Sequence, residues 1–285
     1  MRASEVARAV TVARALVASY GLPADGAAVL HNSNKLTLRL LPCDVLARVA
    51  PAADRSAYAE LDLARRLAGA GCPVAAPDPR TEPRVHERDG FVVTLWTYYA
   101  PLASPEVPPA AYAHALARLH AGMRTLDAPA AGAPAPDLPV PHVTDRIEQA
   151  RRLVADRERT PALAAADREL LGDTLRSLRR TVTGHGGPEQ LLHGEPHPGN
   201  LLATADGPLF IDFETCCRGP VAFDLAHAPD EAAAFYPEVD EDLLRACRLL
   251  VLTLVTTWRW DRHDQFPDGR RMGTEWLDRI RAARA

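Results

Sequence analysis

The stretch HGEPHPGNLL, residues 193–202, and the later segment FIDFE, residues 210–214, decide how this chain is interpreted. Glu195 stands five residues before Asn200, and Asp212 follows after a predicted turn at Asp206-Gly207. Carboxylate and amide oxygens are the ligands that Mg²⁺ prefers, and a further carboxylate beside them can orient a hydroxyl group. Short strands on either side of the turn would bring the three side chains to one edge. The pattern therefore predicts a metal-dependent catalytic site.

The order of these residues matches the catalytic segment of protein kinases. That segment reads H-R-D-L-x-x-x-N and is followed by D-F-G, and its asparagine and second aspartate hold magnesium. The five-residue offset from Glu195 to Asn200 equals the offset from aspartate to asparagine in that motif. Phosphoryl transfer requires metal ions that neutralise phosphate oxygens, so the match predicts a phosphate-transferring site.

The N-terminal region offers other pieces that such a site needs. HNSNK, residues 31–35, would form the tip of a hairpin that covers phosphates, although it lacks a glycine-rich composition. VLAR, residues 45–48, would form the next strand and would place the cation Arg48 below that hairpin. Glu60 lies twelve residues further on, inside a predicted helix. By analogy with kinases, Glu60 is predicted to pair with Arg48 and to hold it in place.

A hinge segment and a single lysine complete the set. LWTYYAP, residues 95–101, would be the hinge at which Trp96, Tyr98 and neighbouring backbone groups meet a nucleotide base. Lys35 is the sole lysine among 33 basic residues, so most cationic roles must fall to arginine. Arginine stays charged at any working pH and can grip phosphate oxygens, which suits Arg48. Lys35 is the other candidate for phosphate contact, although a loop lysine is ordinarily solvated.

Periodicity and turn residues predict the element order. Strand-like alternation covers residues 28–50, and Asp89-Gly90 predicts a tight turn between two further strands. Helical spacing is found near residues 4–19, 55–69, 112–123, 143–157, 166–182 and 243–258, and a short strand-rich island near 190–214 interrupts the later helices. The proline-rich stretch around residue 105 separates a predicted strand-rich domain, residues 1–99, from a predicted helical domain, residues 100–285. A second Pro/Ala-rich stretch, 127–142, is predicted to be an exposed loop.

Composition excludes several classes of protein. The formal net charge of −4 argues against nucleic-acid binding, which usually needs a basic face. No run of eighteen apolar residues is present, so a membrane-spanning helix is not expected. The five cysteines are odd in number and form no C-x-x-C motif. Together with an N-terminus that lacks a secretory apolar region, this predicts a cytoplasmic protein without disulfides.

These pieces, in this order, resemble the aminoglycoside phosphotransferase family. The family loop commonly reads HGDxHxxN, and HGEPHPGN differs from it only in having glutamate for aspartate. IDFETCCRGPVAFDLAH, residues 211–227, resembles the family's following segment, which ends near Asp224. The likeness covers roughly residues 28 to 230. It implies an α+β, bilobal, protein-kinase-like fold with a small β-rich N-lobe and a larger, mostly helical C-lobe.

The resemblance also implies roles. The protein would be a small-molecule kinase that uses ATP or GTP and Mg²⁺ to phosphorylate an alcohol group. Glu195 would be the base-position carboxylate, Asn200 and Asp212 the metal ligands, and Arg48 the contact to the nucleotide phosphates. Glu60 would orient Arg48, and Asp224 would support the catalytic loop rather than touch substrate.

Three questions stay open at the sequence level. The acceptor is an aminoglycoside-like or other antibiotic, or a choline- or homoserine-type metabolite. Acidic residues after position 229 would suit a cationic acceptor, but a solvated acidic surface explains them equally well. Glu195 and Arg48 also fit a pseudokinase-like protein that binds nucleotide without transferring phosphate. Zinc hydrolysis is not expected, because the H-x-E at residue 193 lacks a later P-C-x-x-C and no H-E-x-x-H is present.

Overall fold

The computed structural model describes residues 1–102, 106–127 and 140–284, so most of the predicted exposed loop 127–142 lies outside the described residues. The chain forms two compact units. The first comprises Met1–Ala111, Ala121–Leu138 and Gly199–Thr215, and the second comprises Tyr112–His120, Pro139–Pro198 and Cys216–Ala285.

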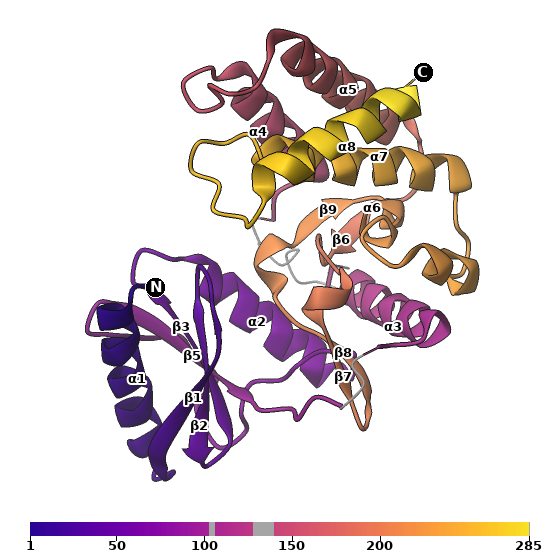
Figure 1. Ribbon diagram of the computed structural model, residues 1–285. Coiled ribbons are helices and arrows are strands. Elements are labelled where there is room, and N and C mark those ends of the chain that lie inside the picture. Colours follow the sequence, from indigo (N-terminus) through magenta and orange to yellow (C-terminus); the bar gives the residue numbers. More distant parts are fainter. Residues whose placement is uncertain (103–105, 128–139, 285) are drawn as a thin grey trace. The chain divides into compact units, whose positions relative to one another are not determined.

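The first unit is built on a five-stranded antiparallel sheet with the order β1-β2-β3-β5-β4 (Figure 1). The strands are β1 (Ala24–Asn32), β2 (Leu36–Pro42), β3 (Val45–Pro51), β4 (His86–Arg88) and β5 (Phe91–Thr97), and the helices are α1 (Ala3–Ala18) and α2 (Ser56–Gly69). Asp89 and Gly90 join β4 to β5 with φ angles of 51° and 83°. Positive φ at both positions is what a two-residue hairpin turn requires, so the turn predicted at Asp89-Gly90 is confirmed.

The two faces of this sheet carry different side chains. Because successive residues of a strand point to opposite faces, alternate positions pack against α1. The resulting core contains Leu38 of β2, Ala47 of β3 and Val93 of β5, together with the apolar stripe of α1. The intervening residue Val92 packs instead with Ala57 of α2. The two helices thus cover opposite faces of the sheet (Figure 1). The polar residues Thr37, Arg48 and Thr94 occupy the alternate strand positions, which face away from α1.

A second hairpin belongs to the same unit. Its strands are β7 (Leu201–Thr204) and β8 (Gly207–Phe210), joined through the predicted Asp206-Gly207 turn. Phe210 donates its N–H to Pro73 at 2.8 Å and accepts from Ala75 at 3.0 Å, which fixes the hairpin to the segment after α2. Short 3₁₀ turns flank the hairpin, namely η1 (Pro198–Asn200) before it and η2 (Phe213–Thr215) after it.

The second unit is mostly helical. Its elements are α4 (Val143–Ala155), α5 (Ala165–Gly184), β6 (Gln190–Leu192), β9 (Cys217–Gly219), α6 (Val221–Leu225), η3 (Asp230–Phe235), α7 (Glu241–Trp258), α8 (Gly269–Arg284) and the middle of α3 (Pro109–Asp127). Helix α7 contacts α4, α5, α6 and α8, and it buries Leu244, Cys247 and Leu250 of the predicted stripe. The sequence did not predict α8, whose apolar residues are sparse.

Among the described residues, no helix is both long and apolar enough to cross a membrane. All five cysteines are free thiols.

Candidate active site

Arg48 and Glu60 form the predicted pair. Arg48 lies in the middle of β3, between Thr37 of β2 and Thr94 of β5, on the face opposite α1. Glu60 lies in the second turn of α2 and is only 2% exposed. A guanidinium nitrogen of Arg48 donates to Glu60 Oε1, while its other terminal nitrogen lies 3.3 Å from Asp212 Oδ1. Arg48 is therefore held between two carboxylates.

Lys35 reaches the same cluster from the hairpin turn that precedes β2. Its ammonium lies 2.6 Å from Glu214, 3.2 Å from Glu60 Oε2 and 3.9 Å from Asp54. The side chain is only 7% exposed, so the ordinary expectation of a solvated loop lysine is wrong for this residue. Three carboxylates offset the cost of taking an ammonium out of water, which is why burial is tolerated here.

Burial and the two cations act in opposite directions on Glu60. Burial raises the pKa of the Glu60 carboxyl, and the charges of Arg48 and Lys35 oppose that rise without cancelling it. For Lys35, burial lowers the pKa, but Glu60 and Glu214 outweigh burial and Arg48 and raise it above its ordinary value. Lys35 therefore stays protonated at neutral pH, and the cluster carries two permanent cations.

Asn200 and Asp212 are brought together by the backbone. Ile211 donates its N–H to the carbonyl oxygen of Asn200 at 3.0 Å, so the residue before Asp212 is fixed to Asn200. Asp212 itself has a φ of 67°, an uncommon conformation for a residue with a side chain. Its Oδ1 is buried and accepts no hydrogen bond from the described residues, although it is ion-paired with Arg48.

The donor set fits magnesium better than zinc. Within the region of the chain that the structure describes, no three His, Cys, Asp or Glu side chains form a cluster able to hold a metal ion. Mg²⁺ does not require such a cage, because it is usually bound by one or two carboxylates together with substrate phosphates. The carboxylate of Asp212, with one oxygen that accepts no hydrogen bond from the described residues, and the amide of Asn200 are ligands of the kind that such a magnesium site uses.

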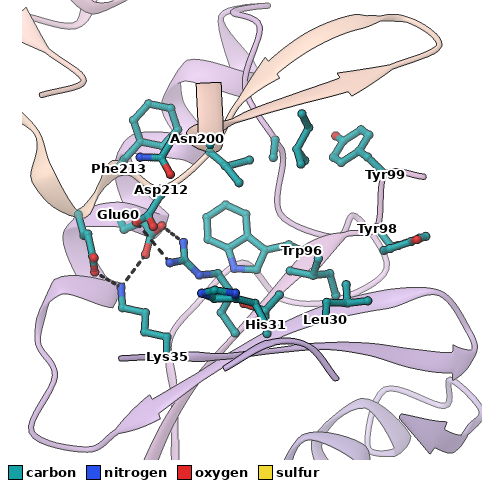
Figure 2. A pocket seen from close by; sticks show the side chains of 18 of the residues that line it. Leu30, His31, Lys35, Glu60, Trp96, Tyr98, Tyr99, Asn200, Asp212 and Phe213 are labelled. Carbon is teal, nitrogen blue, oxygen red and sulfur yellow. Dashed lines mark hydrogen bonds and ion pairs between the residues drawn. The ribbon is translucent and has the colours of Figure 1, made fainter. Parts of the chain in front are cut away.

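A cavity of about 480 Å³ opens beside this cluster, and all of its lining belongs to the first unit. Figure 2 shows Lys35, Glu60, Asn200 and Asp212 at one end and Tyr98 and Tyr99 at the other. Trp96 lies between the two ends, and its indole N–H donates to Thr94 at 2.8 Å. One end of the cavity is therefore charged, whereas the other is walled by rings.

The backbone just after β5 is open to a ligand. Among the described residues, no hydrogen bond uses the backbone N–H or C=O of Tyr98 or Tyr99, which both line the cavity. The Tyr99 hydroxyl accepts from the N–H of Ala76 at 3.3 Å, and the Tyr98 ring lies under the guanidinium of Arg39 at 4.1 Å. These contacts hold the two rings while leaving their backbone groups available.

The loop that carries Glu195 lies in the second unit and is fixed by Asp224. This carboxylate is completely buried and accepts the backbone N–H groups of His193 and Gly194, each at 2.8 Å. It also contacts His120 Nε2 at 2.9 Å, and the other ring nitrogen of His120 is 2.7 Å from the Tyr236 hydroxyl. The predicted role of Asp224, to support the loop, agrees with these contacts.

The charge of Asp224 is stabilised where it lies. Burial alone would raise the pKa of the Asp224 carboxyl, but hydrogen bonds and charges from His120, His193 and Gly194 bring it below its ordinary value. The carboxylate is therefore ionised at neutral pH. An ionised, fully hydrogen-bonded carboxylate gives the loop a rigid base.

Glu195 is the accessible carboxylate of this loop. Its side chain is 40% exposed, and its Oε1 lies 3.5 Å from a guanidinium nitrogen of Arg146 on α4. The same nitrogen of Arg146 donates to the carbonyl oxygen of Gly194 at 3.2 Å. Arg146 therefore helps to set the direction of the Glu195 side chain.

A family model described as the phosphotransferase enzyme family matches residues 33–280. The chain belongs to this family. The predicted resemblance is thus confirmed, and the protein is a small-molecule phosphotransferase. A search of curated protein sequences found no match.

Solved structures share the fold of this phosphotransferase. The amicoumacin kinase hAmiN, in complex with AMP-PNP and Ca²⁺, has a TM-score of 0.68 at 14% identity, over 99% of this chain and 96% of its own. A GDP complex of aminoglycoside 2'-phosphotransferase-IIIa has a TM-score of 0.67 at 17% identity, over 96% and 98%. A choline/ethanolamine kinase family protein from Mesorhizobium loti has a TM-score of 0.59 at 21% identity, over 98% of this chain and 94% of its own. At these identities the likeness establishes the kinase-like α+β fold that the sequence predicts.

Sequence reasoning missed several residues of this phosphotransferase. Glu214, two positions after Asp212, has no role in the sequence prediction, yet it makes the shortest contact to Lys35. Tyr99 belonged to the hinge segment but was not singled out. His120 and Arg146 lie far from residue 195 in the chain, and no local pattern marks them. Their positions are explained only by their partners in the fold: His120 contacts the buried carboxylate of Asp224, and Arg146 donates to the carbonyl oxygen of Gly194.

Proposed function

We propose that this phosphotransferase moves the terminal phosphoryl group of ATP or GTP, with Mg²⁺, to a hydroxyl group of a small molecule. The observation that supports the proposal best is the cavity of the first unit, which has rings at one end and charges at the other. A nucleotide has the same polarity, with an apolar base at one end and phosphates at the other. The volume of about 480 Å³ lies in the range of small-molecule sites.

The nucleotide base would lie against Trp96 and Tyr98. The open backbone groups of Tyr98 and Tyr99 would supply hydrogen bonds to the base edge, in the place where the sequence predicts a hinge. The phosphates would then extend toward the charged end of the cavity, where Arg48 and Lys35 lie. Rings bury the apolar base, and the few polar groups fix its orientation.

Asn200 and Asp212 would hold the metal ion. A bound Mg²⁺ would neutralise the negative charge that develops on the phosphate oxygens during transfer. The role of the protein is to present oxygen ligands at fixed positions. The hydrogen bond from the Ile211 N–H to the Asn200 carbonyl oxygen holds Asn200 beside the residue that precedes Asp212. Arg48, paired with Asp212 and Glu60, keeps the Asp212 carboxylate oriented toward the cavity.

Glu195 would orient the acceptor hydroxyl and take its proton. Glutamate is one methylene longer than the aspartate usual at this position, which moves the carboxylate by ~1.5 Å. The phosphoryl-transfer transition state is loose, so the carboxylate mainly positions the hydroxyl and accepts its proton late. Two prolines, Pro196 and Pro198, fix the backbone around the longer side chain, and Arg146 directs it. We therefore propose that Glu195 is a working substitute.

The acceptor would be a hydroxylated and cationic small molecule, such as an aminoglycoside-like antibiotic or a choline- or homoserine-type metabolite. Structural neighbours bear names of both kinds, since one is an aminoglycoside phosphotransferase and another a choline/ethanolamine kinase family protein. Glu231, Glu241 and Asp242 are exposed in the segment before and at the start of α7. Exposed carboxylates raise the local concentration of cationic ligands.

A turnover assay tests the proposal. Purified protein is incubated with Mg²⁺, ATP or GTP, and a panel of hydroxylated antibiotics and amino alcohols, and products are read by mass spectrometry. We expect a gain of one phosphate on at least one acceptor, and loss of that product in Asp212→Ala. The matched control Asp206→Ala, in the exposed β7–β8 turn, should keep full activity. Nucleotide binding without any phosphorylated product would favour the pseudokinase-like alternative, and full activity of Asp212→Ala would remove the metal assignment.

A further inference from the structure

The only lysine of the chain is in an unusual place. Lys35 is the last residue of the turn between β1 and β2, and the turn is closed by a hydrogen bond from Ser33 N–H to the Lys35 carbonyl at 3.1 Å. Its side chain nevertheless points inward and lines the cavity (Figure 2). A buried ammonium is retained only where carboxylates compensate it, and Lys35 has Glu60, Glu214 and Asp54 within 4 Å.

Glu60 divides its two oxygens between two cations. Its Oε1 accepts from Arg48 and its Oε2 accepts from Lys35 at 3.2 Å. One helix carboxylate thus aligns a strand arginine with a turn lysine. The sequence gives the phosphate-binding role to the strand residue, but the structure offers two cations for that role and holds them differently.

Arg48 is fixed on both sides. Its two terminal nitrogens contact Glu60 and Asp212, and neither of these partners is easily replaced, because Glu60 is buried and Asp212 is the proposed metal ligand. The planar guanidinium is suited to such a bracket between two carboxylates. Arg48 therefore has the contacts of a residue that positions Asp212.

Lys35 is held by a partner that can be exchanged. Its shortest contact is with Glu214, whose side chain is 31% exposed and comes from the short 3₁₀ turn η2. Glu214 also receives a weak contact from the Ser56 hydroxyl at 3.5 Å. An ammonium is a compact charge with three rotatable donors, so it can exchange a carboxylate oxygen for a phosphate oxygen without a large movement.

The charge balance of this end of the cavity favours such an exchange. Asp54, Glu60, Asp212 and Glu214 contribute four negative charges, whereas Lys35 and Arg48 contribute two positive ones, which leaves a formal charge of −2. Phosphates entering this end would be repelled unless a metal ion enters with them, and a cation that turns from its carboxylate to the phosphates lowers the repulsion locally. Glu214 is the most exposed of the four carboxylates, with 31% against 29%, 25% and 3%.

We propose that Lys35, and not Arg48, is the cation that binds the nucleotide phosphates, and that Glu214 occupies its ammonium until nucleotide arrives. Arg48 then acts as a positioning residue that holds Asp212. This division of roles rests on the proposed nucleotide-dependent function. It places the phosphate-binding lysine in the hairpin turn, where it would also fold that turn over the bound phosphates.

Binding measurements separate the two cations. Calorimetric titration of MgATP compares the wild type with Lys35→Met, Arg48→Met and the control Arg84→Met, an exposed residue of the same unit that pairs only with Glu82 among the described residues. We expect Lys35→Met to weaken nucleotide affinity about 10- to 100-fold, the range for a hydrogen bond between charged groups. Arg48→Met should instead raise the Mg²⁺ concentration needed for half-maximal turnover. Lys35→Arg should restore some of the affinity.

A second readout does not depend on any variant being folded. Because Lys35 is the sole lysine, an acyl phosphate derivative of ATP can acylate only one side-chain amine in the wild-type protein. The amine attacks the acyl carbonyl and ATP leaves. We expect the acyl group on Lys35 and its suppression by excess MgATP. Wild-type affinity in folded Lys35→Met, or acylation that MgATP does not reduce, would overturn the proposal. A wild type that binds no nucleotide would instead overturn the proposed function.

Discussion

Asp224→Asn is the substitution that tests most directly how the catalytic loop is held. The carboxylate receives three donors in the buried interior: the N–H of Gly194 on Oδ1, and the N–H of His193 and a ring nitrogen of His120 on Oδ2. Asparagine has nearly the same shape but one oxygen only. Whichever way the amide is turned, its NH₂ group must face at least one backbone N–H, and that donor loses its acceptor.

The magnitude follows from burial. Asp224 is 0% exposed, so solvent cannot replace the lost partner. An orphaned buried donor costs about 1–3 kcal/mol, and removal of one member of a buried charged network costs about 3–5 kcal/mol. We expect Asp224→Asn to lower the free energy of unfolding of the second unit by about 3 kcal/mol. This corresponds to a change of about 100-fold in the ratio of folded to unfolded protein.

Urea unfolding, followed by far-ultraviolet circular dichroism, measures the change. The control Asp173→Asn removes an exposed carboxylate of α5 that pairs with Arg176, and should change the free energy of unfolding by less than about 0.5 kcal/mol. If Asp224→Asn is as stable as the control and retains wild-type kcat, Asp224 does not hold the loop and the reasoning fails.

The pH dependence gives an independent test of the same residue. Because the pKa of Asp224 is lowered in the folded state, its ionised form stabilises the fold above the unfolded pKa of about 3.9. That stabilisation is lost as the pH falls through the still lower folded pKa. The stability difference between wild type and Asp224→Asn should therefore be largest at neutral pH and shrink only below about pH 4. A difference that is the same at neutral pH and well below the folded pKa would show that charge plays no role.

Three further variants test neighbouring features of the loop. Glu195→Gln keeps the shape but removes the basic oxygen, so kcat should fall by about 10²-fold or more with little change in nucleotide affinity. The control Glu189→Gln, which changes a similarly exposed carboxylate, should retain the wild-type kcat. Equal kcat values for the two variants would show that Glu195 takes no part in catalysis. Gly194 has a φ of 90°, so Gly194→Ala should cost about 1–2 kcal/mol in thermal or urea unfolding, and an unchanged midpoint would mean that the loop has another conformation in solution. Burial lowers the pKa of His227 to about 3, so its folded state stays neutral while the unfolded state gains a proton below about pH 6.5. His227→Gln should flatten the loss of stability between about pH 6.5 and about pH 4, and a profile identical to the wild type would contradict the burial of this ring.

Local patterns were enough to predict most of the elements. The alternation in β2, the helical spacing of α2 and the Asp-Gly turns each depend on residues within one turn or strand of one another, and each was found where the sequence predicts it. The Arg48–Glu60 pair was predictable for a similar reason. A strand followed at once by a helix that covers its sheet leaves little freedom in where a residue twelve positions later can lie.

The sequence by itself therefore determined most of the element order, the family, and the candidate residues on the catalytic loop and on β3. It left Lys35 as an ordinary loop lysine, gave Glu214 no role, and did not link His120 to Asp224 across 104 positions. These three facts arise from desolvation. A buried charge loses its hydration, so it must be compensated by polar groups that the folded chain brings within about 3 Å. Neither the spacing of residues in the sequence nor the composition predicts which groups those are. Only the tertiary structure shows which carboxylate compensates which cation.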